Sequence, residues 1–165
     1  MKNSKKTLSI VATLLLFSLT TLAQTTNFSG KWTRNDEKTI PGASSSMNSV
    51  PVSVEITQTN GMISLKRTSK HADGQVFTYS EDLKFDGSMA ASQPIPNMHK
   101  QGRIAWSADK TAFVETADYI DDQGKHIQKA VENWALSDGG KTLTIDLTLT
   151  TGDGEYKLHE VFDKN

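Results

Sequence analysis

The chain contains no cysteine among its 165 residues. No disulfide can hold the fold together, so the protein must draw its stability from packing and hydrogen bonding. The same absence excludes thiol nucleophiles and cysteine-ligated metals. It also excludes a bacterial lipid anchor, because that anchor is attached to a cysteine.

Motifs for metal or nucleophilic chemistry are missing as well. The histidines form neither a His-x-His nor a His-Glu-x-x-His pair, so their spacing gives no signal for a metal site. No Gly-x-Ser-x-Gly elbow and no phosphate-binding glycine loop are present. Asp73, Asp86, Asp138 and Asp153 lie beside glycine, which is turn chemistry, and no aspartate fits an EF-hand loop. We therefore predict no metal and no cofactor. The four histidines are His71, His99, His126 and His159.

Residues 1–23 differ in character from the rest of the chain. Three lysines precede an apolar run at residues 8–17, and a stretch of small residues ends at Ala23. This layout is typical of a secretory signal peptide. The run is shorter than the roughly 20 apolar residues that cross a bilayer. We predict a cleavable signal peptide at 1–23 and one exported domain at 24–165, which is periplasmic or secreted.

The predicted mature segment is mildly acidic. Removing the three lysines of the leader changes the formal net charge from −1 to −4, with 15 basic against 19 acidic residues. Nucleic acids and anionic membranes are bound through basic patches, so neither is expected as a main partner. No stable membrane anchor is left after cleavage. About 142 residues are enough for one domain with a core of its own, and we expect a monomer or a weak dimer.

The mature segment shows no helical period over ten or more residues and reads instead as strands. Residues 52–57 alternate apolar and polar side chains, as a half-buried strand does. Asn60-Gly61 follows and leads into a return strand at 62–68. This dipeptide suits a type I′ turn, since both positions accept positive φ. We predict a tight hairpin here.

The same pattern of strand and turn continues to the end of the chain. Strands at short, regular spacing indicate a sandwich or a barrel, and sequential hairpins favour an up-and-down meander whose closure removes exposed edges. We therefore predict an all-β fold, a single antiparallel up-and-down β-barrel of about 8–10 strands. The expected strands are 30–34, 52–57, 62–68, 75–85, 88–91, 103–106, 111–116, 126–136, 142–149 and 156–162.

Two longer stretches are expected to be irregular, namely 35–48 and 93–101. The second contains Pro94 and Pro96, so it cannot lie in a central strand. The first holds Pro-Gly-Ala-Ser-Ser-Ser, a poor helix former, and is expected to be a loop.

A short motif near the start of the mature segment resembles that of a known superfamily. Phe28-x-Gly30-x-Trp32 is similar to the opening of calycins, the lipocalins and fatty-acid-binding proteins. The run Trp-Ala-Leu-Ser-Asp-Gly-Gly-Lys-Thr-Leu at 134–143 and the turn Phe-Asp-Gly at 85–87 resemble small exported lipocalin-like proteins of bacteria. The resemblance implies that Trp32 caps the closed end of the barrel and that Gly30 allows tight packing there. Lipocalins place a basic residue on this tryptophan near the last strand. No clear match is visible, and Lys157 and His159 are the candidates for it.

A barrel of this size can hold one small ligand. The aromatic and aliphatic candidates for its inner wall would otherwise simply fill the core. Tyr79 and Trp106 are favoured because each combines an apolar body with one hydrogen-bonding group. The candidates are Phe77, Tyr79, Ile104, Trp106, Phe113 and Trp134.

Charged residues within strands are expected on the solvated face. Two of opposite sign that pointed inward would have to pair, because a lone buried charge is costly. Arg67 follows Ile63 and Leu65 in the alternation and is the candidate clamp for a ligand carboxylate. The charged strand residues considered are Arg67, Glu115, Lys129 and Glu132.

The sequence leaves three functions open. The first is an exported lipocalin-like protein that binds a small apolar or amphipathic ligand inside the barrel. The second is a filled barrel that acts as a protein-interaction module. The third, and least favoured, is an enzyme on a calycin frame. Fold alone cannot decide among them.

Overall fold

The computed structural model describes residues 25–40, 50–70 and 73–165, and these residues form ten strands and no helix. The all-β prediction is confirmed. No helix in the described ranges has the length and apolarity to span a membrane. The predicted signal peptide lies outside the described residues. The strands are Gly30–Arg34 (β1), Pro51–Gln58 (β2), Met62–Lys70 (β3), Val76–Lys84 (β4), Ala90–Ile95 (β5), Met98–Trp106 (β6), Ala112–Asp121 (β7), His126–Ser137 (β8), Thr142–Thr151 (β9) and Gly154–Lys164 (β10).

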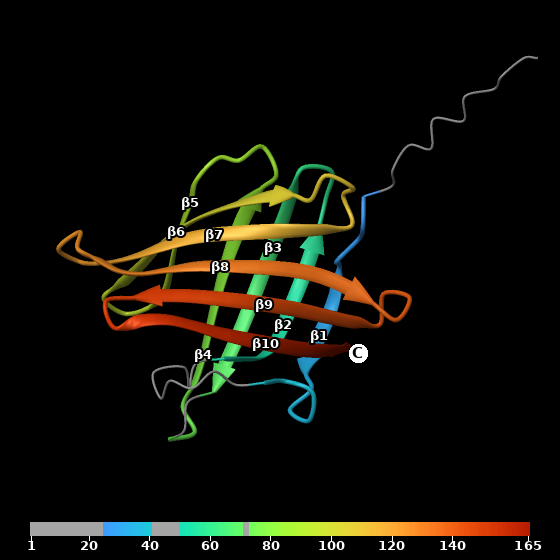
Figure 1. The fold of residues 1–165 in the computed structure, drawn as a ribbon, viewed down its shortest axis with the longest axis horizontal. Helices are drawn as coiled ribbons and strands as arrows, with labels where there is room; N and C mark the ends of the chain where they lie inside the picture. Colours follow the sequence, from blue (N-terminus) through green and yellow to red (C-terminus); the bar gives the residue numbers. More distant parts are fainter. Residues whose placement is uncertain (1–24, 41–49, 71–72) are drawn as a thin grey trace, which may run out of the picture.

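The ten strands form one antiparallel sheet in the order β4-β3-β2-β1-β10-β9-β8-β7-β6-β5. Each strand pairs with the next strand in the chain, except that β4 does not pair with β5. The first strand, β1, pairs with the last, β10. The sheet curls so that β2–β4 cross β7–β10 at a steep angle in a second layer (Figure 1). β4 and β5, the two ends of the sheet, contact each other without a hydrogen-bonded ladder. The result is a nearly closed up-and-down barrel, as predicted.

The stretch 93–101 is not irregular, which corrects the prediction made for it. Pro94 lies within β5, and β6 begins at Met98. A proline is tolerated here because β5 is an edge strand, on whose free side no ladder hydrogen bond is lost. Asn97, with φ 63°, makes the turn between the two strands.

The turn at Asn60-Gly61 joins β2 to β3 as predicted, but it is not type I′. Neither residue has a positive φ. The Gly61 amide instead donates to the Thr59 carbonyl at 2.8 Å, which makes a three-residue turn centred on Asn60. The segment 35–40 contains a turn and an isolated bridge from Ile40 to His159, and the rest of the predicted loop at 35–48 lies outside the described residues.

Aromatic side chains plug one end of the barrel. Phe28 and Phe113 meet edge to face with ring centroids 4.9 Å apart, and Phe113 stacks on Trp134 at 5.2 Å. Phe85 stacks on Trp106 at 4.1 Å beside them. Such pairs contribute beyond the area they bury. This aromatic plug fills the barrel at the level of the Phe-x-Gly-x-Trp motif.

Trp32 is fully buried beside the plug and donates its indole N–H to the Phe28 carbonyl at 3.1 Å. The basic residue that packs on this tryptophan is Lys164, whose Nζ lies 4.9 Å from the ring centroid. Gly30, at φ 152°, makes room for it, since a Cβ there would lie 2.7 Å from the Lys164 Cε. Lys157 and His159 were the wrong candidates. They pair with Glu155 and Asp146 on the outer face.

Replacing Trp32 with alanine should lower the free energy of unfolding by about 3–5 kcal/mol, as for other large buried aromatics. Urea denaturation followed by circular dichroism measures it. Lys164→Met, which keeps the packing and removes the charge, should cost no more than about 2 kcal/mol. A loss below about 1 kcal/mol for Trp32→Ala would show that the residue does not close this end of the barrel.

Candidate functional site

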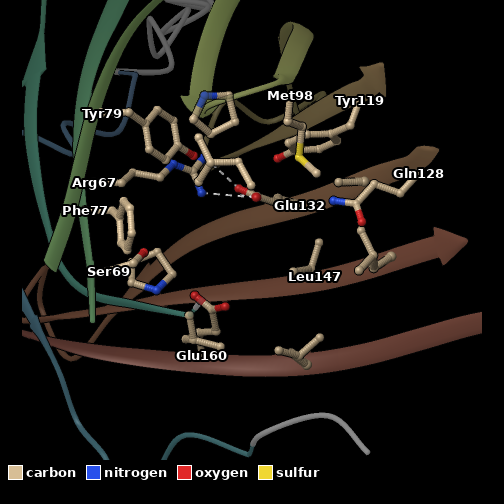
Figure 2. A pocket seen from close by; sticks show the side chains of 17 residues that line it. Arg67, Ser69, Phe77, Tyr79, Met98, Tyr119, Gln128, Glu132, Leu147 and Glu160 are labelled. Atoms are coloured by element: carbon tan, nitrogen blue, oxygen red, sulfur yellow. Dashed lines mark hydrogen bonds and ion pairs between the residues drawn. The ribbon is translucent and has the colours of Figure 1, made fainter. Parts of the chain in front are cut away.

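A cavity of about 310 Å³ occupies the barrel interior (Figure 2). Its wall is mostly apolar, with a few convergent polar groups, which is the composition of small-molecule sites. The apolar lining includes Phe77, Met98, Leu147, Leu149 and Leu158, and the polar lining includes Arg67, Ser69, Tyr79, Tyr119, Gln128, Glu132 and Glu160.

Five charged side chains from five strands meet inside the barrel. Arg67 (β3) donates from Nη1 and Nη2 to the two carboxylate oxygens of Glu132 (β8), at 3.1 and 2.8 Å. Its Nη2 also donates to Glu115 (β7) at 2.7 Å, and its Nε lies 3.4 Å from Glu81 (β4). Lys100 (β6) lies 2.8 Å from Glu81 and 2.5 Å from Glu115. We call these five residues the buried ion cluster, and all are less than 10% exposed.

The strand register brings the cluster together. Glu115 and Glu132 are direct cross-strand partners, and they would repel one another without the cations. Gly102 leaves the space that they need, because a Cβ there would lie 3.1 Å from Glu115 Oε1. Trp134 lies on the plug side and donates its indole N–H to Glu132 at 3.0 Å. The Arg67 guanidinium lies over its ring at 4.8 Å. The cluster therefore lies between the aromatic plug and the cavity and contacts both.

The cluster also crosses the open seam of the barrel. Glu81 on β4 binds Lys100 on β6, and it accepts a hydrogen bond from Ser92 on β5 at 3.2 Å. Where the sheet lacks a ladder, side chains make the connection.

The cluster holds three carboxylates but only two cations, so full ionisation would leave a negative charge uncompensated. Burial raises the pKa of Glu115 to about 7, and the negative charges of Glu81 and Glu132 add to the rise against the pull of Lys100. Burial also acts on Glu132, but the charges of Arg67 and Lys100 and the hydrogen bonds of Arg67 and Trp134 outweigh it and lower the pKa of this carboxyl. The two pKa values therefore shift in opposite directions, and Glu115 is the carboxyl of this pair that gains a proton first as the pH falls.

Glu160 on β10 is a separate buried acid. It is 3% exposed, lines the cavity, and makes no side-chain hydrogen bond or ion pair with any residue that the structure describes. Figure 2 shows its carboxyl group directed into the cavity from β10. Burial raises its pKa to about 8, and the charge of Glu132 adds to the rise. Tyr79 and Tyr119 offer hydroxyl groups from other walls, and burial raises the pKa of both.

The structure separates the sequence-predicted site residues into two groups. Arg67, Phe77 and Tyr79 line the cavity. The others lie on the side of the aromatic plug. Ile104, Phe113 and Trp134 are buried in the core there, and Trp106 packs against them. The ion cluster is the reason for this division, because it separates the plug from the cavity. Three of the four charged strand residues are inside rather than solvated, namely Arg67, Glu115 and Glu132, and only Lys129 is exposed as expected.

Arg67 is not free to clamp a ligand carboxylate, since the protein's own acids occupy both terminal nitrogens. Sequence reasoning missed Lys100, Glu81 and Glu160. Lys100 fell in a stretch expected to be irregular. Glu81 and Glu160 were visible only through strand alternation: Glu81 follows Tyr79 and precedes Leu83 at the same period, and Glu160 follows Leu158 and precedes Phe162.

The sequence matches no protein-family model, and a comparison with curated proteins finds no match. Among solved structures, the chain is similar to zebrafish ileal bile acid-binding protein, crystallised in complex with cholic acid. The TM-score is 0.51 at 13% sequence identity, over 84% of this chain and 98% of that chain. The likeness shows that this chain shares the barrel fold of that protein.

Removing the arginine of the buried ion cluster should destabilise the protein strongly. Arg67→Met leaves three buried carboxylates facing Lys100 alone within the cluster, and breaking a buried ion pair costs about 3–5 kcal/mol. Urea denaturation at pH 7 measures the loss. Lys129→Met on the exposed face of β8 is the matched control and should change stability by no more than about 0.5 kcal/mol. Equal effects of the two substitutions would mean that the cluster is hydrated.

Glu160 should make the protein less stable as the pH rises. Its pKa is 4.5 when exposed and about 8 when folded, so between these values the folded state keeps a proton that the unfolded state has lost. The Glu160 contribution is therefore present below about pH 4.5 and is lost as the pH rises towards 8. The free energy of unfolding of Glu160→Gln should therefore rise relative to that of the wild type as the pH increases over this interval. Urea denaturation at pH 4.5, 6.5 and 8.5 measures the difference. A stability difference that does not change with pH would contradict the burial of this carboxyl.

Proposed function

We propose that this protein is an exported lipocalin-like carrier that binds one small amphipathic molecule inside its barrel. The observation that carries the proposal is the cavity of about 310 Å³ with an apolar wall and convergent polar groups. A barrel filled by its own side chains, as an interaction module would have, leaves no room of this size.

The fold supports the same function. The similar zebrafish protein was crystallised with cholic acid, so a barrel of this architecture can enclose an amphipathic molecule. The buried ion cluster fixes the inner end of the cavity and keeps the plug side of the barrel closed to a ligand. Export rests on the sequence of residues 1–23, whose basic head and short apolar run are typical of a signal peptide.

Native mass spectrometry of the protein purified from its own host tests the proposal. We expect a population that carries an extra small-molecule mass, which is lost when the protein is denatured. Spectra of the unliganded protein alone, from cells in several growth phases, would contradict the proposal.

Filling the cavity gives the matched variant for this experiment. Ala130 is buried in the cavity wall, so Ala130→Phe places a ring where the ligand would lie. Ala105→Phe makes the same change on the exposed side of β6. The bound mass should disappear from the first variant and persist in the second, provided that both retain the β-sheet circular dichroism of the wild type.

A further inference from the structure

The cavity offers a ligand a buried acid, Glu160, outside the buried ion cluster. Glu160 has no hydrogen bond or ion pair with any described residue, yet it is 3% exposed and its carboxyl group is directed into the cavity (Figure 2). A buried polar group without a partner is costly, and a ligand that supplied a donor would remove that cost.

The cation of the cavity wall is already engaged. Both terminal nitrogens of Arg67 are bound by Glu115 and Glu132, and its Nε faces Glu81. A carboxylate ligand would therefore find no unpaired cation here, and it would face the negative charge of Glu132. The lining thus disfavours fatty acids and other anionic amphiphiles.

We propose that the ligand carries a protonated amine, which lies against Glu160 while a hydrocarbon chain packs on Leu147, Leu149 and Leu158. This inference rests on the proposed function and narrows it to cationic amphiphiles. The three leucines line the same cavity from β9 and β10, next to Glu160. An ammonium group donates hydrogen bonds, and its positive charge complements the negative charge of an ionised carboxylate.

The charge state of Glu160 is compatible with this pairing. In the empty cavity burial raises its pKa to about 8, and a cation within about 4–6 Å lowers the pKa of a carboxyl again. The groups that face Glu160 are Arg67 and Glu132 from within the barrel and Arg34 from β1. Binding of the amine should therefore ionise Glu160 and release its proton.

The volume sets the size of the test ligands. At the roughly 30 Å³ that one water molecule occupies in the liquid, about 310 Å³ corresponds to roughly ten heavy atoms. Decylamine, 1-decanol and decanoate each contain ten carbon atoms and differ in the head group. Isothermal titration calorimetry of the unliganded protein at pH 8, with each ligand below its aggregation concentration, compares their affinities.

We expect decylamine to bind about tenfold more tightly than decanol, the difference that one charged hydrogen bond supplies, and decanoate to bind most weakly. Glu160→Gln should weaken decylamine by about tenfold while leaving decanol within about threefold, which shows that the variant keeps its cavity. Glu155→Gln, an exposed change on the same strand, should alter neither affinity.

Different results would contradict the amine ligand and the binding function. Binding of decanoate as tight as that of decylamine, or a Glu160→Gln variant that binds decylamine like the wild type, would overturn the amine inference and leave a binding barrel in place. Failure of all three ligands to bind the wild type, together with empty native mass spectra, would overturn the proposed function itself.

Discussion

The buried ion cluster is the interaction on which the rest of this structure depends. Arg67, Glu81, Lys100, Glu115 and Glu132 come from five different strands, so their pairing fixes how those strands lie across the barrel. The cluster connects β4 to β6 where the sheet has no ladder, and it separates the aromatic plug from the cavity. A buried ion network is weak evidence for stability, but breaking one is costly. Its role here is to specify one closed arrangement.

The cluster also determines what the cavity can bind. It engages both of its own cations, and the carboxyl of Glu160 in the same lining has no hydrogen bond or ion pair with any residue that the structure describes. The fold is shared with a barrel that was crystallised with a bile acid, whereas the cationic ligand that we propose for this one rests on the charges inside its own barrel. Architecture and ligand chemistry are thus set by different residues. The strand register sets the first, and the balance of acids and bases within the barrel sets the second.

The fold was accessible from the sequence because its signals are local. Strand alternation and turn residues predict the meander, and the Phe28-x-Gly30-x-Trp32 motif marks the closed end. Contacts between distant strands were not accessible, which is why Lys164 was missed as the partner of Trp32. Alternation placed Arg67 on the apolar side, but only the register across β7 and β8 shows that Glu115 and Glu132 meet it. Even the turn at Asn60-Gly61 differed in type, because a dipeptide allows a conformation without requiring it.

Carboxyl-carbon NMR titration of the unliganded protein tests this account most directly, since it reads each glutamate separately. The account predicts that Glu132 titrates below the usual range for glutamate, held there by Arg67 and Lys100 against the effect of burial, and that Glu160 titrates with a pKa of about 8. Titration of both carboxyls near 4.5, the pKa of an exposed glutamate, would mean that water reaches them. The buried ion cluster and the cavity built above it would then be contradicted together.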